Sequence, residues 1–110
     1  MSSASDLPQA NFRISEAAKR GIEWLRAHQE KITGVTPGVV FVAWGIRNAN
    51  GSEQQQSVIV GFYDKSQDDE VKDGIQIVDG VPLIFFTNER YVARFEGKVL
   101  DFKGKKFFLA

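Results

Sequence analysis

The chain contains no cysteine. It therefore forms no disulfide, offers no thiolate to a metal or an iron–sulfur cluster, and has no thiol nucleophile. Histidine is nearly as scarce, since His28 is the only one. A zinc site or a serine–histidine pair within this chain would depend on that single imidazole. These two shortages leave little room for metal or nucleophilic chemistry.

Long hydrophobic runs and an excess of one charge are also missing. No apolar stretch approaches the roughly 20 residues that a transmembrane helix needs. The start, residues 1–11, lacks the basic and apolar regions of a signal peptide. Fourteen Lys and Arg residues balance fourteen Asp and Glu residues, so no net charge draws the chain to nucleic acid or to an anionic membrane. We expect a cytoplasmic protein whose partner is neither a membrane nor nucleic acid.

Apolar residues, by contrast, are plentiful at 43% of the 110 residues, and nine residues are Phe. This is enough for one domain with a single core. Ser15 occupies a helix N-cap position, and Gly34 is a natural stop. Between them apolar residues recur at helical spacing, which predicts an amphipathic helix. Gly21 lies inside this helix, which suggests that another group packs closely against its backbone.

β-Branched and aromatic residues follow the predicted helix. Residues 39–47 are apolar on both faces, which indicates an interior strand. The polar stretch 48–56 contains Asn50-Gly51, a strong reversal signal, so residues 57–64 should return as the second strand of a hairpin. Further short strands are predicted over residues 75–78, 81–86, 98–102 and 106–109.

Turn residues separate these short strands. Asp73-Gly74 and Asp79-Gly80 each predict a tight turn between strands. Pro82 cannot donate to a strand ladder, so it should lie at an edge or at the first residues of its strand. Thr87 is predicted to cap a short helix over residues 88–94.

The predicted element order defines the fold class. A helix comes first, then two long strands, several short strands, a helical turn and two last strands. This order predicts an α+β fold in which an N-terminal helix accompanies mostly antiparallel, curled β-sheets. We expect a flexible N-terminus over residues 1–11 and one domain over residues 12–110.

From Phe12 onward the sequence resembles the HesB/IscA-like family, the A-type iron–sulfur carriers. The opening Ile14-Ser15-Glu16-Ala17-Ala18-Lys19-Arg20-Gly21-Ile22 is similar to that family's first helix. The hairpin is followed by Asp68-Asp69-Glu70-Val71, which is similar to the acidic residues at the start of a strand in that family. The next stretch, Asp73-Gly74-Ile75 through Val78-Asp79, is similar to the family's Asp-Gly-apolar-apolar-Asp element. The clearest likeness is Phe95-Glu96-Gly97-Lys98-Val99-Leu100-Asp101-Phe102, followed by Lys106-Phe107-Phe108. The resemblance implies the HesB-like fold.

The departures from this family concern its ligands. The family binds iron or a cluster through one cysteine in a Gly-rich loop after the first long strand and others in a Cys-Gly-Cys tail. The corresponding residues 44–51 contain no cysteine, and the sequence given ends at Ala110 without such a tail. The resemblance therefore implies the fold without the carrier activity. It implies a degenerate, non-catalytic member that serves as a protein-interaction or oligomerisation module, with no cofactor.

An alternative reading starts from the acidic residues. Asp64, Asp68, Asp69 and Glu70 cluster in the sequence, and carboxylates suit Mg²⁺ or Ca²⁺. Together with His28 they would make a small-molecule or metal-ion site, and the protein could then be an enzyme. The spacing differs from the calcium-binding loop, however, and roles in turns and on a solvated face explain these acids better. We expect no enzyme activity.

Partner binding offers a further set of candidate residues. Asn88-Glu89-Arg90-Tyr91 joins polar and aromatic residues on the predicted short helix, and exposed Arg and Tyr side chains are frequent in binding hot spots. Trp44 and Tyr63 lie on the two hairpin strands, where each is either a core residue or an exposed contact. We therefore take Trp44, Tyr63, Arg90 and Tyr91 as candidate partner-binding residues and expect a protein partner or a homo-oligomer. A weaker alternative is nucleic-acid binding by the basic segment 90–106.

Overall fold

The computed structural model describes residues 7–49 and 53–110 of the chain. The first long element is helix α1 (Glu16–Thr33). The Ser15 hydroxyl accepts a hydrogen bond from the Ala18 N–H, and Gly34 ends the helix with φ 73°, where its N–H donates to the Glu30 carbonyl at 2.8 Å. The predicted helix is therefore confirmed together with both of its caps.

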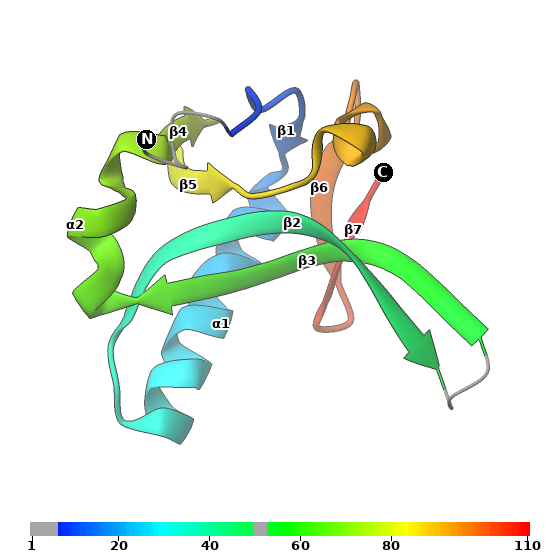
Figure 1. Cartoon of the computed structure of the whole chain (residues 1–110). Coiled ribbons are helices and arrows are strands. Elements are labelled where there is room, and N and C mark those ends of the chain that lie inside the picture. Colours follow the sequence, from blue (N-terminus) through cyan, green and yellow to red (C-terminus); the bar gives the residue numbers. More distant parts are fainter. Residues whose placement is uncertain (1–6, 50–52) are drawn as a thin grey trace.

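In the described part of the chain, seven strands form two sheets (Figure 1). The larger has the order β3-β2-β5-β4 and the smaller the order β1-β6-β7. The strands are β1 (Arg13–Ile14), β2 (Pro37–Ala49), β3 (Glu53–Asp64), β4 (Ile75–Val78), β5 (Val81–Phe85), β6 (Val99–Lys103) and β7 (Lys106–Leu109). Three of the five strand pairs are antiparallel, while β1–β6 and β2–β5 are parallel. The predicted α+β class is confirmed.

β2 lies between β3 and β5, so the interior strand predicted over residues 39–47 is also confirmed. Both hairpin strands are longer than predicted, since pairing continues to Ala49 opposite Glu53. The Asn50-Gly51 reversal lies outside the described residues. Pro82 is the second residue of β5 and pairs only with Ile77 of β4, because pairing with β2 begins at Leu83. This is the placement that its missing N–H requires.

The connection after β3 differs from the prediction. Residues 65–74 form consecutive short helices, namely η2 (Lys65–Gln67), α2 (Asp68–Val71) and η3 (Lys72–Gly74). Asp64 begins this helical segment with a capping box, because its carboxylate accepts from the Ser66 N–H while Gln67 accepts from the Asp64 N–H. The tight turn predicted between strands at Asp73-Gly74 is therefore wrong.

The other predicted turn is correct. Asp79 (φ 49°) and Gly80 (φ 84°) both adopt positive φ between β4 and β5. Two such residues in a two-residue connection suit the twist of a hairpin, and Asp and Gly tolerate this conformation best. The predicted capping residue of the short helix is wrong, because η4 (Glu89–Arg94) is capped by Asn88 and not by Thr87.

The core lies between α1 and the two sheets. Helix α1 contacts both β2 and β6, and the rings of Phe12, Phe85 and Phe95 pack together at its centre with centroids 4.8–5.4 Å apart. Gly21 is buried because the Phe102 ring lies directly over it; a Cβ atom at Gly21 would be 2.5 Å from the ring. The close packing predicted at Gly21 is thus confirmed.

The segment before Phe12 is attached to the larger sheet. The Gln76 side chain accepts a hydrogen bond from the Ala10 N–H at 2.6 Å and donates one to the Pro8 carbonyl at 2.8 Å. The Asn11 side chain donates to the Val92 carbonyl at 3.0 Å. Of the sequence segment predicted to be flexible, Pro8, Ala10 and Asn11 therefore have hydrogen-bond partners in the rest of the domain. None of the helices in the described residues is long and apolar enough to span a membrane.

Candidate functional site

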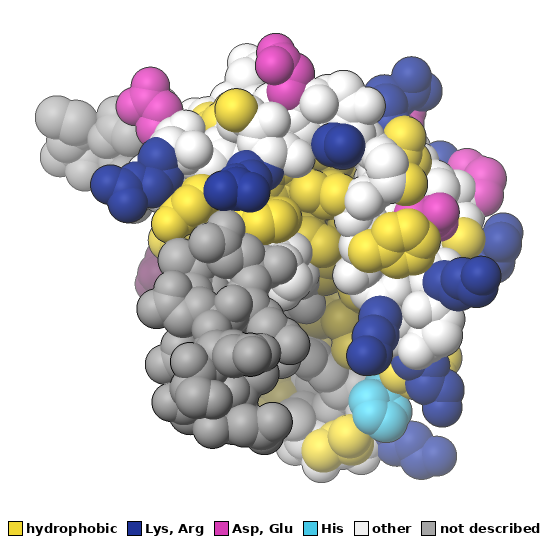
Figure 2. Space-filling view, turned by 90° about the vertical axis from the view of Figure 1, so that its right-hand side faces the viewer, with side chains coloured by type: hydrophobic (Ala, Val, Ile, Leu, Met, Phe, Trp, Pro, Cys, Tyr) yellow, Lys and Arg dark blue, Asp and Glu magenta, His cyan; other side chains and the backbone are white. Residues whose placement is uncertain are grey.

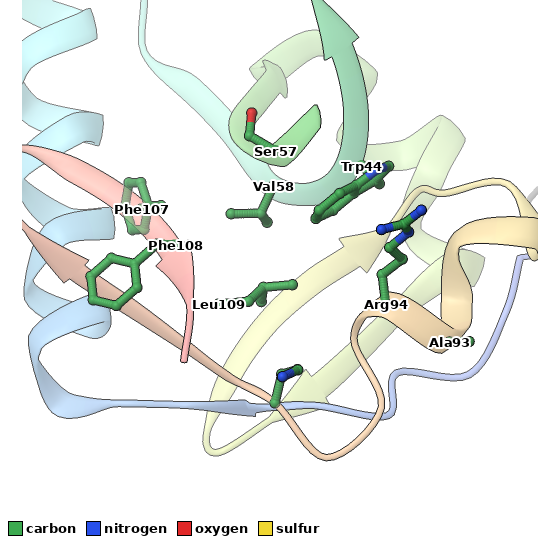
Figure 3. A pocket seen from close by; sticks show the side chains of 9 residues that line it. Trp44, Ser57, Val58, Ala93, Arg94, Phe107, Phe108 and Leu109 are labelled. Carbon is green, nitrogen blue, oxygen red and sulfur yellow. The ribbon is translucent and has the colours of Figure 1, made fainter. Parts of the chain in front are cut away.

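An open hollow of about 460 Å³ lies where the β2–β3 hairpin, η4 and the C-terminal strand meet (Figure 3). We call it the β3–β7 cleft. Its lining residues are Trp44, Ser57, Val58, Ala93, Arg94, Lys98, Phe107, Phe108 and Leu109. These residues come from segments far apart in the sequence, and most of them are apolar. Figure 2 shows the face that includes this region, where hydrophobic surface gathers in a hollow with Lys and Arg side chains around it.

Trp44 forms one wall of the cleft. It pairs with Val58 across the hairpin, on the strand face that also carries buried Val42. Its ring meets Phe95 edge-to-face at 6.0 Å, so the core fixes its orientation. The indole Nε1 is buried and finds no acceptor among the described residues. Trp44 is thus a half-buried residue with one edge in the core and one side on the cleft.

Arg94 and Lys98 supply the charge. The Arg94 guanidinium lies 5.5 Å from the centre of the Trp44 ring, which is a cation–π contact. Arg94 is the last residue of η4, and Lys98 follows before β6. Within residues 7–49 and 53–110 neither side chain forms a salt bridge. The cleft therefore offers two positive groups beside an apolar surface.

β7 forms the opposite wall. Its residues alternate between exposed and half-buried. Phe107 and Leu109 pack against the core, and the Phe107 ring lies 4.6 Å from that of Phe102. The Phe108 side chain lies on the opposite face of β7, because side chains alternate along a strand, and it is 38% exposed. β7 is the edge strand of its sheet, so β6 is its only strand neighbour among the described residues.

The structure does not bring the four candidate partner-binding residues together. Trp44 lines the β3–β7 cleft, whereas Tyr63 lines a smaller hollow with Pro37 and Phe62. The Tyr63 ring contacts Phe41 at 5.5 Å, and partial burial raises the pKa of its hydroxyl.

Arg90 and Tyr91 lie in η4, where the Arg90 guanidinium is 6.0 Å from the Tyr91 ring, but neither lines the cleft. Arg94, Val58, Phe108 and Leu109 line the cleft but were not identified from the sequence as candidate binding residues. The available signal was the run Phe107-Phe108-Leu109 next to a basic turn, since an edge strand with three consecutive apolar residues leaves one of them outside the core.

Three residues of the alternative metal site, His28, Asp64 and Asp68, have other partners. His28 is exposed and stacks on Trp24 at 5.1 Å. Asp68 accepts a hydrogen bond from the Val39 N–H at 3.0 Å and pairs with Lys65 at 3.6 Å. The Asp64 carboxylate accepts from the N–H and hydroxyl of Ser66, which lowers its pKa. In the part of the chain that the structure describes, no group of three or more His, Asp or Glu residues could hold a metal ion.

Comparison with known proteins gives no assignment. The chain matches no protein-family model, and neither the curated proteins nor the solved structures contain a significant match.

Proposed function

We propose that this chain is a non-catalytic HesB/IscA-like domain without iron–sulfur ligands, and that it binds a protein partner through the β3–β7 cleft. The family part of this proposal rests on the sequence likeness described above and on the absence of cysteine. Without thiolates the chain lacks the ligands that hold such clusters.

The position of the cleft supports this proposal. Its walls come from β2, which carries Trp44, and from β7, which ends one residue before Ala110. The likeness places the family's cysteines in the loop after the first long strand and in the tail beyond the last strand. Trp44, the first residue of the stretch 44–51 that corresponds to that loop, lines the cleft, and so does Leu109 at the end of β7.

The observation that carries the binding function is the composition of the cleft. Partner sites combine aromatic anchors, arginine and a surface that excludes water. Trp44, Arg94 and Phe108 provide this combination, with the Arg94 guanidinium in cation–π contact with the Trp44 ring.

Two experiments test the proposal. The first is anaerobic reconstitution of the purified chain with iron and sulfide, followed by iron and sulfide analysis after desalting. We expect no cluster absorbance and no stoichiometric iron. A cluster bound at one per chain would overturn the family part of the proposal.

The second experiment tests the cleft. A photo-reactive benzoylphenylalanine replaces Phe108, and a control carries it at Ile77, which is 67% exposed on β4. After irradiation in a lysate of the producing cells, we expect a discrete cross-linked protein at position 108 only. It should disappear when Arg94→Glu and Lys98→Glu are added. The same bands at both positions, or none at position 108, would refute binding through the cleft.

A further inference from the structure

We infer that the β3–β7 cleft takes an acidic peptide segment, in which one large aliphatic or aromatic side chain is flanked by Asp or Glu residues. This inference rests on the proposed function and specifies the partner. Three observations support it: the apolar pocket, the two basic side chains that line it, and the poor match of the acidic stretch Asp64 to Asp73 in a second copy.

The apolar pocket requires an anchor side chain. Trp44, Val58 and Leu109 come from three strands and surround one space (Figure 3). A volume of about 460 Å³ exceeds a single side chain and lies at the small end of the range of ligand pockets. It therefore has room for one large apolar side chain and part of the residues on either side of it. The hollow is open rather than enclosed, which suits a chain segment that enters and leaves.

The surrounding charge favours carboxylates next to that anchor. Two basic side chains, Arg94 and Lys98, line the cleft. Neither of the acids in the segment 90–106, Glu96 and Asp101, is among the lining residues. Asp101 accepts hydrogen bonds from the Ser15 hydroxyl at 2.7 Å and the Phe102 N–H at 2.9 Å, which ties it to the helix cap. Since opposite charges steer association, an acidic partner fits this surface.

Among the described residues, the acidic stretch of a second copy does not offer this chemistry. Its acidic stretch, Asp64 to Asp73, is helical over much of its length, and two of its carboxylates already bind backbone N–H groups. The apolar residue within that stretch is Val71, which is half-buried. It provides no large exposed anchor beside free carboxylates. The expected occupant is therefore a different polypeptide.

Nucleic acid also carries negative charge, but its bases bind by stacking on open aromatic faces. In this cleft Arg94 lies over the Trp44 ring and Phe95 meets that ring edge-to-face. An aliphatic or aromatic side chain entering between Val58 and Leu109 needs no such open face. The geometry therefore favours a peptide.

The test is selection of a phage-displayed library of random linear dodecapeptides on the immobilised full chain. A parallel selection uses the chain with Arg94→Glu and Lys98→Glu, two exposed positions. We expect the wild type to enrich peptides with one large apolar residue flanked by Asp or Glu, and the double variant not to enrich them. Circular dichroism confirms that the double variant is folded.

Binding of the most enriched peptide is then measured by fluorescence anisotropy. We expect the dissociation constant to rise at least tenfold with Arg94→Glu, at least tenfold with Leu109→Ser, and less than twofold with Lys72→Glu, a matched exposed lysine beside α2. In a nitrogen-15 spectrum the peptide should shift the indole signal of Trp44 and leave that of Trp24 in place. This pair of indoles reports the binding position directly.

Enriched peptides without acidic residues, equal binding to the double variant, no enrichment at all, or a shift of Trp24 alone would each overturn the inference. Cross-linking at Phe108 shows whether failure of this inference also means failure of the proposed function. A cross-linked partner without enriched peptides would mean that the cleft binds a folded surface. Self-association lost with Arg94→Glu would instead assign the cleft to a second copy of the chain.

Discussion

Asp79 and Arg13 join the two sheets across 66 positions of sequence. Both carboxylate oxygens of Asp79 accept hydrogen bonds from Arg13 Nε, at 3.0 and 2.9 Å. The same carboxylate accepts from the Ile14 N–H at 2.8 Å. One residue of the β4–β5 turn thereby holds β1, which pairs with β6 in the other sheet.

This contact predicts a pH dependence of stability. The Arg13 side chain and the Ile14 N–H lower the pKa of Asp79 to about 2. Because the folded-state pKa is below the ordinary value of 3.8, the contact stabilises the fold fully above that value and is lost as the pH falls through about 2. We expect the free energy of unfolding of the wild type to fall more steeply between pH 4 and 2 than that of Asp79→Asn.

Urea unfolding at several pH values measures this difference. Asn tolerates positive φ, so Asp79→Asn keeps the turn. Asp73→Asn is the control, because the Asp73 side chain accepts no hydrogen bond within the described residues. Equal pH profiles for the wild type and Asp79→Asn would contradict the role of the carboxylate.

The cap of η4 gives a second prediction. Asn88 accepts a hydrogen bond from the Arg90 N–H at 3.0 Å, whereas the Thr87 hydroxyl is buried with no partner among the described residues. Replacing a capping Asn by Ala costs about 1 kcal/mol. Removing an unsatisfied buried hydroxyl by Thr87→Val should leave stability unchanged or raise it by up to about 1 kcal/mol. Thermal unfolding of both variants checks the assignment, and a larger loss from Thr87→Val than from Asn88→Ala would reverse it.

The contact between Gly21 and Phe102 gives a third prediction. Ala in place of Gly inside a helix normally gains about 1 kcal/mol. At Gly21 the added Cβ would lie 2.5 Å from Cγ of the Phe102 ring, and such overpacking costs about 1–3 kcal/mol. We expect Gly21→Ala to lower the free energy of unfolding by about 1 kcal/mol in urea titrations.

A double-mutant cycle with Phe102→Leu tests the cause, because a smaller side chain should relieve the crowding at Gly21. The matched control is Ala27→Gly at an exposed position of the same helix. It should cost about 1 kcal/mol through helix propensity alone. Stabilisation by Gly21→Ala would show that the ring moves away without cost.

Local signals predicted much of the fold. The caps at Ser15 and Gly34 and the Asp79-Gly80 turn each depend on the conformation of a few neighbouring residues. Side-chain periodicity likewise predicted β2 as an interior strand. The errors arose where two local signals competed. At Asp73-Gly74 the capping box of Asp64 began a helical segment, and at Thr87 the neighbouring Asn88 took the capping role.

The candidate site was less predictable. Trp44 was identified from its residue type, but its neighbours Arg94, Val58 and Leu109 were not. The predicted hairpin pairs residues 44 and 58, but no local pattern relates them to residues 94 and 109. That proximity depends on how the two sheets and η4 are arranged. Residue type alone did not separate Trp44 from Tyr63, an aromatic residue that lines the smaller hollow instead.

The sequence by itself determined the absence of thiolate chemistry, the balance of charge and most of the order of helix and strands, because these follow from composition and from neighbours along the chain. Only the tertiary structure decided which face of each strand meets another element. The β3–β7 cleft exists because β7 packs beside the β2–β3 hairpin at one edge of its sheet. Such long-range contacts arise from the joint burial of apolar surface by many residues, and no single segment encodes them.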